Sequence, residues 1–189
     1  MQAEAYSDLP VIDVDCTMPI DSLISLMRDS FARVFGDSLK ISVDKDINER
    51  NFPSAKSRQR VKRATAFSLL PLCPREEGRR EKISSLRVIE KMSRQNRDPA
   101  DIRDFLYFAI RCPEIAAENT MVVLGSVLVA EIPESEKQAR EGFKSVPFFT
   151  KRGKRFCLDL LWFKIDWPGG CKFLAKDKEQ SAQFLCFSS

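Results

Sequence analysis

Residues 156–165 read FCLDLLWFKI, and this stretch indicates the class of fold. It is apolar at nearly every position, which is typical of a β-strand covered on both faces. Asp159 is the exception in its first half, and a carboxylate in a buried strand needs a cationic partner. We therefore expect a central strand here, with a structural ion pair between Asp159 and a lysine or arginine.

The flanking residues predict further strands. The sequence WPGG at residues 167–170 places Pro and Gly at the central positions of a type II turn. We expect CKFLAKD, residues 171–177, to return after it as the paired strand of a C-terminal β-hairpin, with a bulge at Gly170. Upstream, MVVLGSVLVA at residues 121–130 has the composition and length of another buried strand.

The N-terminal part predicts a β-α-β opening. VIDVDC, residues 11–16, alternates apolar and acidic residues as a strand does, and Leu39, Ile41 and Val43 alternate as a second strand. Between them, Thr17 is a candidate N-cap and Gly36 a candidate C-terminal stop of a helix. The apolar residues of this helix recur at helical spacing: Ile20, Leu23, Ile24, Met27, Phe31, Val34 and Phe35.

Two more helices are predicted in the middle of the chain. The first carries Ile83, Leu86, Ile89 and Met92 at helical spacing. The second is expected to begin with Asp98 as N-cap and Pro99 at its first position, and to stop at Pro113. The whole pattern predicts an α+β fold, with a mixed sheet of about five strands and three or four helices.

The length of 189 residues and the 43% of hydrophobic residues fit a single domain over residues 1–189. We expect residues 51–67 to be a basic exposed arm, an edge strand or an irregular helix of that domain. No apolar run reaches the roughly 18 residues of a membrane span, and the start MQAEAYSDLP has no signal-peptide pattern. The expectation is an intracellular, cytoplasmic protein with no membrane contact.

The amino-acid composition excludes several kinds of catalytic and metal-binding site. The chain has no histidine, which excludes Ser-His-Asp and Cys-His nucleophiles and imidazole metal ligands. Its six cysteines form no CxxC pair, so we expect no zinc site and mostly buried, reduced thiols. No glycine-rich phosphate loop occurs either. These absences favour a non-enzymatic protein with no cofactor and no metal.

The charge is concentrated in the middle third of the chain. Residues 40–103 carry 17 lysines and arginines against nine acids, whereas residues 1–39 are acidic. Residues 54–67, SAKSRQRVKRATAF, contain five cations and no acid, and neither a helix nor a strand would give them an apolar face to bury. A row of surface cations of this kind can follow a phosphate backbone.

A second basic run, KRGKR at residues 151–155, precedes the central strand and is expected to be a loop. Its cations would add to the positive electrostatic field of residues 54–67. The expected partner is therefore nucleic acid, RNA or DNA, or an acidic protein surface. The candidate phosphate-binding residues are Lys56, Arg58, Arg60, Lys62, Arg63, Arg79, Arg80, Lys151, Arg152, Lys154 and Arg155.

Two other functions stay open. The first is a protein–protein interaction module, an inhibitor or an assembly subunit, including a homo-oligomer that docks through the apolar tail SAQFLCFSS. The aromatic residues of the last third supply candidate interface anchors for it: Phe143, Phe148, Phe149, Trp162 and Trp167.

The second alternative rests on the strand VIDVDCT, whose Asp-x-Asp-x-Thr pattern resembles the first motif of haloacid-dehalogenase-like phosphatases. The resemblance implies a parallel α/β sheet, Mg²⁺, Asp13 as nucleophile and Asp15 as acid/base. By the same resemblance, Glu131 and Glu134 would lie in the metal-binding segment, with Arg111 and Ser126 as stand-ins for the family's Lys and its phosphate-binding hydroxyl. On an alternating strand, Asp13 and Asp15 are equally well explained as its solvent-facing side.

Overall fold

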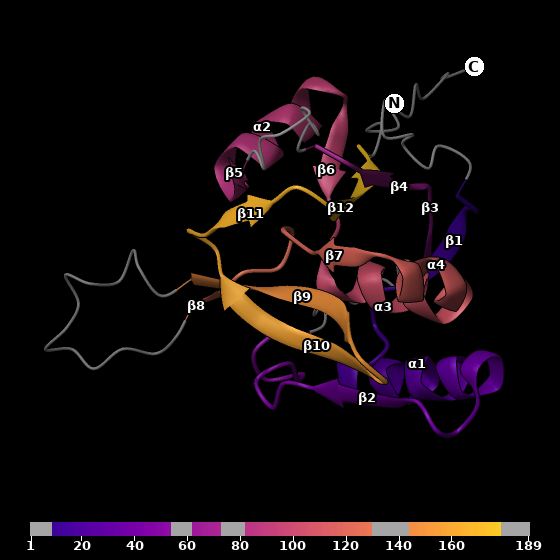
Figure 1. Ribbon diagram of the computed structural model, residues 1–189. Helices are drawn as coiled ribbons and strands as arrows, with labels where there is room; N and C mark the ends of the chain where they lie inside the picture. Colours follow the sequence, from indigo (N-terminus) through magenta and orange to yellow (C-terminus); the bar gives the residue numbers. More distant parts are fainter. Residues whose placement is uncertain (1–8, 54–61, 73–81, 130–143, 179–189) are drawn as a thin grey trace, which may run out of the picture.

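The computed structural model describes residues 9–53, 62–72, 82–129 and 144–178 (Figure 1). Its helices are α1 (Ile20–Phe35), α2 (Ser85–Arg94), α3 (Ile102–Arg111) and α4 (Pro113–Glu118). Its strands are β1 (Ile12–Asp15), β2 (Lys40–Val43), β3 (Lys62–Thr65), β4 (Phe67–Leu70), β5 (Lys82–Ser84), β6 (Arg97–Pro99), β7 (Thr120–Val122), β8 (Leu128–Val129), β9 (Lys144–Arg152), β10 (Arg155–Trp162), β11 (Asp166–Pro168) and β12 (Cys171–Asp177).

The main sheet has eight strands, in the order β2-β10-β9-β7-β12-β4, with β6 also paired to β12 and β8 to β9. It is mixed, because β2 runs parallel to β10 and β7 parallel to β12, whereas the other pairs are antiparallel. The α+β class is confirmed, and the sheet is larger than the expected five strands. Four predicted strand segments lie in this sheet, whereas the predicted strand at residues 11–16 lies outside it as β1. Strands β4 and β9, which were not predicted, and the short strands β6 and β8 make up the rest.

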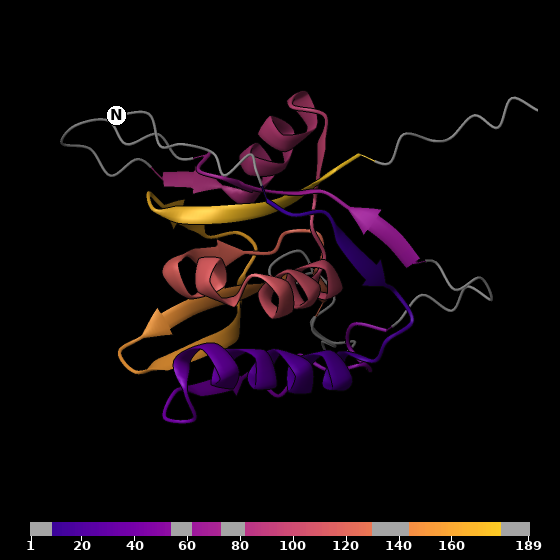
Figure 2. The ribbon, with the colours of Figure 1, turned by 90° about the vertical axis from the view of Figure 1, so that its right-hand side faces the viewer.

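The larger part of the core lies between one face of the sheet and the helices α1, α3 and α4. Phe31 of α1 packs edge-on against Phe149 of β9 and Phe156 of β10, with ring centroids 5.9 and 5.1 Å apart. Figure 2 shows α1 below the α3–α4 pair, so that the helices form one layer. We call this side of the sheet the helical face. Packing on the helical face explains why the even-numbered positions of β10 are apolar.

The opposite face is covered only in part. There α2, β5 and β11 pack over β12 and β7, around Trp167, which is 1% exposed. The part of the same face formed by β9, β10 and β2 carries exposed residues, among them Lys40, Arg152 and Arg155. We call this side the open face. The prediction that residues 156–165 are covered on both sides therefore holds fully toward the helices. It holds only in part on the open face, where Cys157 is buried and Leu161, Phe163 and Ile165 are half-buried.

The predicted C-terminal hairpin is wrong. Strand β10 pairs with β9 and β2, whereas β12 pairs with β4, β6 and β7. Trp167 explains this, because its indole N–H donates to the Ser85 hydroxyl at 2.9 Å and its ring stacks on Phe148. These contacts draw the turn segment across the sheet as β11, so the chain re-enters the sheet beyond β7.

The first two predicted strands and the helix between them exist, but they do not form a β-α-β unit in one sheet. Strand β1 pairs antiparallel with β3 in a separate two-stranded sheet, whereas β2 lies at the edge of the main sheet. The alternation of residues 11–16 is confirmed, since Ile12 and Val14 are buried and Asp13 is exposed.

The second central helix begins three residues later than predicted. Asp98 and Pro99 belong to β6, and the N-cap of α3 is Asp101, which forms a capping box with Asp104. The predicted strand at residues 121–130 is also interrupted. A Cβ atom at Gly125 would lie 2.6 Å from the carbonyl oxygens of Pro99 and Ala100, so this glycine permits a close approach of two chain segments between β7 and β8.

Candidate anion-binding site

The hairpin of β9 and β10 carries the second basic run of the sequence. Its turn has two residues, and Gly153 at the first position has φ of 61°, whereas Lys154 is not among the described residues with positive φ. This is the pattern of a type II′ turn, which joins two twisted antiparallel strands. Residues 151–155 are thus the end of a regular hairpin rather than the predicted loop.

Strand register gathers the cations on the open face. Arg152 lies opposite Arg155 on β9 and β10, and Arg155 lies beside Lys40 on β2. Residues at matching positions of neighbouring strands point to the same face, with strands about 4.8 Å apart. The three side chains therefore form a row across three strands.

The row borders an open cavity of about 510 Å³. Lys154 of the turn lines it as well, together with Ser38 and Cys157. We call Lys40, Arg152, Lys154 and Arg155 the hairpin cation cluster. Sequence reasoning missed Lys40, because a lone lysine far upstream of the hairpin carries no local signal. Only the parallel pairing of β2 with β10 brings it here.

Arg152 is the one member of the cluster with an ion-pair partner among the described residues. Its guanidinium lies 3.2 Å from the Asp159 carboxylate, which confirms the expected structural ion pair of Asp159. Within the described ranges, Lys40, Lys154 and Arg155 form no ion pair. The cluster therefore combines four cations with one counter-ion.

Lys151 belongs to the same basic run but not to the cluster. It lies opposite Phe156 in the hairpin, and its ammonium sits 5.7 Å from the centroid of the Phe156 ring. Phe156 packs on the helical face, so Lys151 emerges on the other side of the hairpin from Arg152 and Arg155. The structure thus divides the predicted run between two faces.

Arg63 differs from the expectation of an exposed surface cation. Its guanidinium lies 2.6 Å from Asp104 and 3.5 Å from Asp101, and Lys176 lies 2.7 Å from Asp104. Burial alone would lower the pKa of Arg63, but the charge and hydrogen bond of Asp104 raise it above its ordinary value. We call Arg63, Asp104 and Lys176 the Asp104 cluster, an internal ion-paired group.

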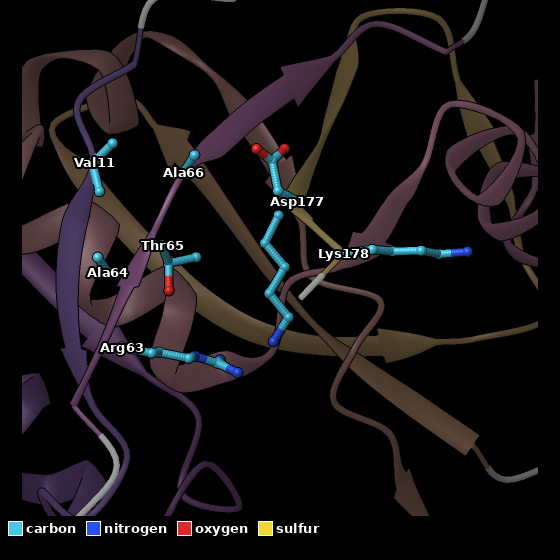
Figure 3. Close-up of a pocket in the computed structure, with 8 residues that line it drawn as sticks. Val11, Arg63, Ala64, Thr65, Ala66, Asp177 and Lys178 are labelled. Atoms are coloured by element: carbon cyan, nitrogen blue, oxygen red, sulfur yellow. The ribbon is translucent and has the colours of Figure 1, made fainter. Parts of the chain in front are cut away.

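The Asp104 carboxylate is completely buried. Burial would raise its pKa, but the charge and hydrogen bond of Lys176, the Asp101 backbone N–H and Arg63 together hold the pKa below its usual value. Arg63 and Lys176 also line a cavity of about 350 Å³ between β3 and the end of β12. Figure 3 shows Arg63 and Thr65 on one side of this cavity, with Asp177 and Lys178 on the other.

The other residues of the central basic segment are only partly described. Lys62 begins β3, where its backbone lies opposite Asp15 of β1, so this end of residues 51–67 is a strand. Lys56, Arg58, Arg60, Arg79 and Arg80 lie outside the described residues. Their contact with phosphate stays a prediction.

The residues that resemble a phosphatase motif do not form such a site in the described part of the chain. Strand β1 lies in an antiparallel pair, whereas the resemblance implies a parallel sheet. The Asp15 carboxylate accepts hydrogen bonds from the Thr17 backbone N–H at 2.9 Å and from its hydroxyl at 2.6 Å, which closes the turn before α1. Asp13 is exposed beside it.

The supporting residues of that motif are dispersed. Arg111 is exposed at the end of α3, and the Ser126 hydroxyl accepts the Ile102 backbone N–H. Glu131 and Glu134 lie outside the described residues. In the ranges that the structure describes, no three Cys, Asp or Glu side chains gather into a group that could hold a metal ion.

The candidate interface aromatics are mostly core residues. Phe149 and Trp167 are buried, and Phe148 is half-buried against Trp167. Trp162 is 60% exposed at the end of β10. Phe143 and the apolar tail lie outside the described residues.

The described cysteines are free thiols. Cys112, Cys157 and Cys171 are buried, and Cys16 is half-buried.

The chain matches no protein-family model, and neither a curated protein nor a solved structure is significantly similar to it. None of the helices in the described ranges has the length and apolar character needed to cross a membrane.

Proposed function

We propose that this protein is a non-enzymatic binding protein that holds the phosphate backbone of RNA or DNA on the hairpin cation cluster. One observation carries the proposal: Lys40, Arg155 and Arg152 stand side by side in one row of the sheet. Like charges at directly opposed positions of neighbouring strands destabilise a sheet. A bound anion would relieve that repulsion.

The chemistry of the cluster suits phosphate. Arginine presents a planar fork of N–H donors that matches phosphate oxygens, and Lys40 and Lys154 add mobile point charges. The Ser38 hydroxyl at the same cavity is a further donor. Exposed Lys and Arg of this kind supply the sequence-independent part of nucleic-acid affinity.

The proposal is tested by titrating a fluorescent 12-nucleotide single-stranded DNA of mixed sequence and following its anisotropy at low salt. Replacing Lys154 and Arg155 together by glutamine is expected to weaken binding at least about tenfold, because two phosphate contacts are lost. The matched control is Lys151→Gln, which removes a charge of the same sign from the same hairpin on its other face. We expect it to bind as the wild type does.

Two results would overturn the proposal. The first is an oligonucleotide affinity that the double variant and Lys151→Gln reduce equally, since binding would then depend only on net charge. The second is tighter binding to polyglutamate than to an oligonucleotide of equal charge, which would favour an acidic protein as the partner.

A further inference from the structure

A second cavity lies on the same open face, next to the hairpin cation cluster. Its volume is about 450 Å³, which is within the range of small-ligand sites. The crossing of β11 over the sheet forms one wall, and strands β7, β9, β10 and β12 supply the rest. Thr120, Phe148, Thr150 and Trp167 are among its lining residues. We call it the β11 cavity.

The two cavities adjoin each other. Cys157 lines the cavity at the cation cluster and lies directly opposite Thr150, which lines the β11 cavity. The pair of Cys157 and Thr150 lies two residues along the strands from the pair of Arg155 and Arg152, which corresponds to a spacing of about 6.6 Å. One ligand of modest size can therefore reach both.

Arg152 connects the two cavities. It extends from the cation row toward Asp159, and Asp159 lies opposite Phe148 of the β11 cavity. The Arg152–Asp159 ion pair therefore lies at the border of the apolar site, and Lys40, Lys154 and Arg155, which form no ion pair in the described ranges, supply the net positive charge beside it. The ligand that fits has an anionic part and an apolar part close together.

The lining of the β11 cavity favours a ligand whose part inside the cavity is flat and carries some polar groups. It offers the ring of Phe148 together with the hydroxyls of Thr120 and Thr150, which lie 3.1 Å apart and share one hydrogen bond. Each hydroxyl has capacity for more than one hydrogen bond. A nucleobase uses both features, since it has a π-face and a polar edge, whereas an acyl chain has no group for the hydroxyls.

We infer that the partner is single-stranded nucleic acid, with a base in the β11 cavity and neighbouring phosphates on the hairpin cation cluster. The inference rests on the proposed function and narrows its substrate class. A base that is stacked and paired in a duplex is not available to the cavity, whereas single strands are commonly bound by an apolar platform beside a cationic groove.

The test compares three eight-nucleotide probes of equal length by anisotropy: a thymidine single strand, the same backbone with abasic sites, and a duplex. We expect the abasic strand to bind about tenfold more weakly than the thymidine strand, because the base contact is lost. Equal affinity of these two would overturn the base site and leave the proposed function intact. Preference for the duplex would also overturn it, whereas failure of all three probes to bind would overturn the proposed function itself.

A protein variant gives an independent comparison. Phe148→Leu keeps an apolar side chain against Trp167 but removes the ring, and we expect it to weaken binding of the thymidine strand several-fold while leaving the abasic strand unchanged. An equal loss on both probes would contradict the inference. The probe comparison on the wild-type protein decides the question even if this variant does not fold.

Discussion

The Asp104 cluster and the hairpin cation cluster are built from the same kinds of side chain but differ in their surroundings. Arg63 and Lys176 are 21% and 16% exposed and converge on a buried carboxylate. Arg152 is 61% exposed, and its neighbours Lys40 and Arg155 form no ion pair in the described ranges. A basic residue is therefore available to a partner only where the fold does not bury it against an internal counter-ion.

The largest expected difference between the clusters concerns stability. Asp104→Asn leaves Arg63 and Lys176 partly buried with only the partly exposed Asp101 carboxylate, 3.5 and 3.6 Å away, so we expect the free energy of unfolding to fall by about 3 kcal/mol. Urea unfolding followed by tryptophan fluorescence measures it. In the hairpin, Asp159→Asn breaks a pair whose arginine is exposed and whose carboxylate is half-buried, and it is expected to cost less than about 1 kcal/mol. Equal losses for the two variants would contradict the comparison.

Acidification provides a second test of the same difference. The pKa of Asp104 in the folded protein lies below its unfolded value, so its stabilising contribution is present above about pH 4 and is lost as the pH falls through the folded pKa. The stability difference between the wild type and Asp104→Asn should therefore shrink below about pH 4. Urea midpoints at pH 7, 5 and 3 would show this, and a constant difference down to pH 3 would contradict it.

These clusters also show how far the sequence predicts the structure. Periodicity identified α1, the alternating strand β1 and the α+β class, because those depend on local patterns of burial. Contacts distant in sequence were missed. One is the hydrogen bond between Trp167 and Ser85, which explains why β12 does not pair with β10. The other is the pairing of β2 with β10, which places Lys40 beside Arg155.

The candidate site was predicted in part for the same reason. The run at residues 151–155 was visible as charge, but only strand register separates Lys151 from Arg152 and Arg155. Similarly, Arg63 was indistinguishable from a surface cation until α3 placed Asp104 against it. The Gly-Lys pair at residues 153–154 is a local hairpin signal that sequence reasoning overlooked.

The turn of the hairpin offers a smaller effect. Gly153 has φ of 61°, and a Cβ atom added there would meet nothing within 4 Å, so Gly153→Ala would add backbone strain without a clash. We expect a loss of about 1 kcal/mol in unfolding free energy, together with weaker oligonucleotide binding as the cations shift. Gly153→Asn should cost less, since asparagine tolerates this conformation. A larger loss for asparagine than for alanine would count against the turn assignment.

The smallest expected effect is on affinity. Asp159→Asn removes the one counter-ion that the described residues give the hairpin cation cluster, so oligonucleotide binding at low salt should tighten about threefold, and less at high salt. The control is Asp21→Asn, which removes an exposed acid from α1 on the helical side. Anisotropy titrations of the three proteins measure the change. Equal tightening by both variants would indicate a general effect of net charge.

The most direct test of the central claim is the dependence of oligonucleotide affinity on salt concentration. If the open face of the hairpin contacts phosphate, the logarithm of the association constant falls linearly with the logarithm of salt concentration. Arg155→Gln should reduce the magnitude of that slope by about one unit, whereas Lys151→Gln should leave it unchanged. A flat slope for the wild-type protein, or the same reduction for both variants, would contradict the account.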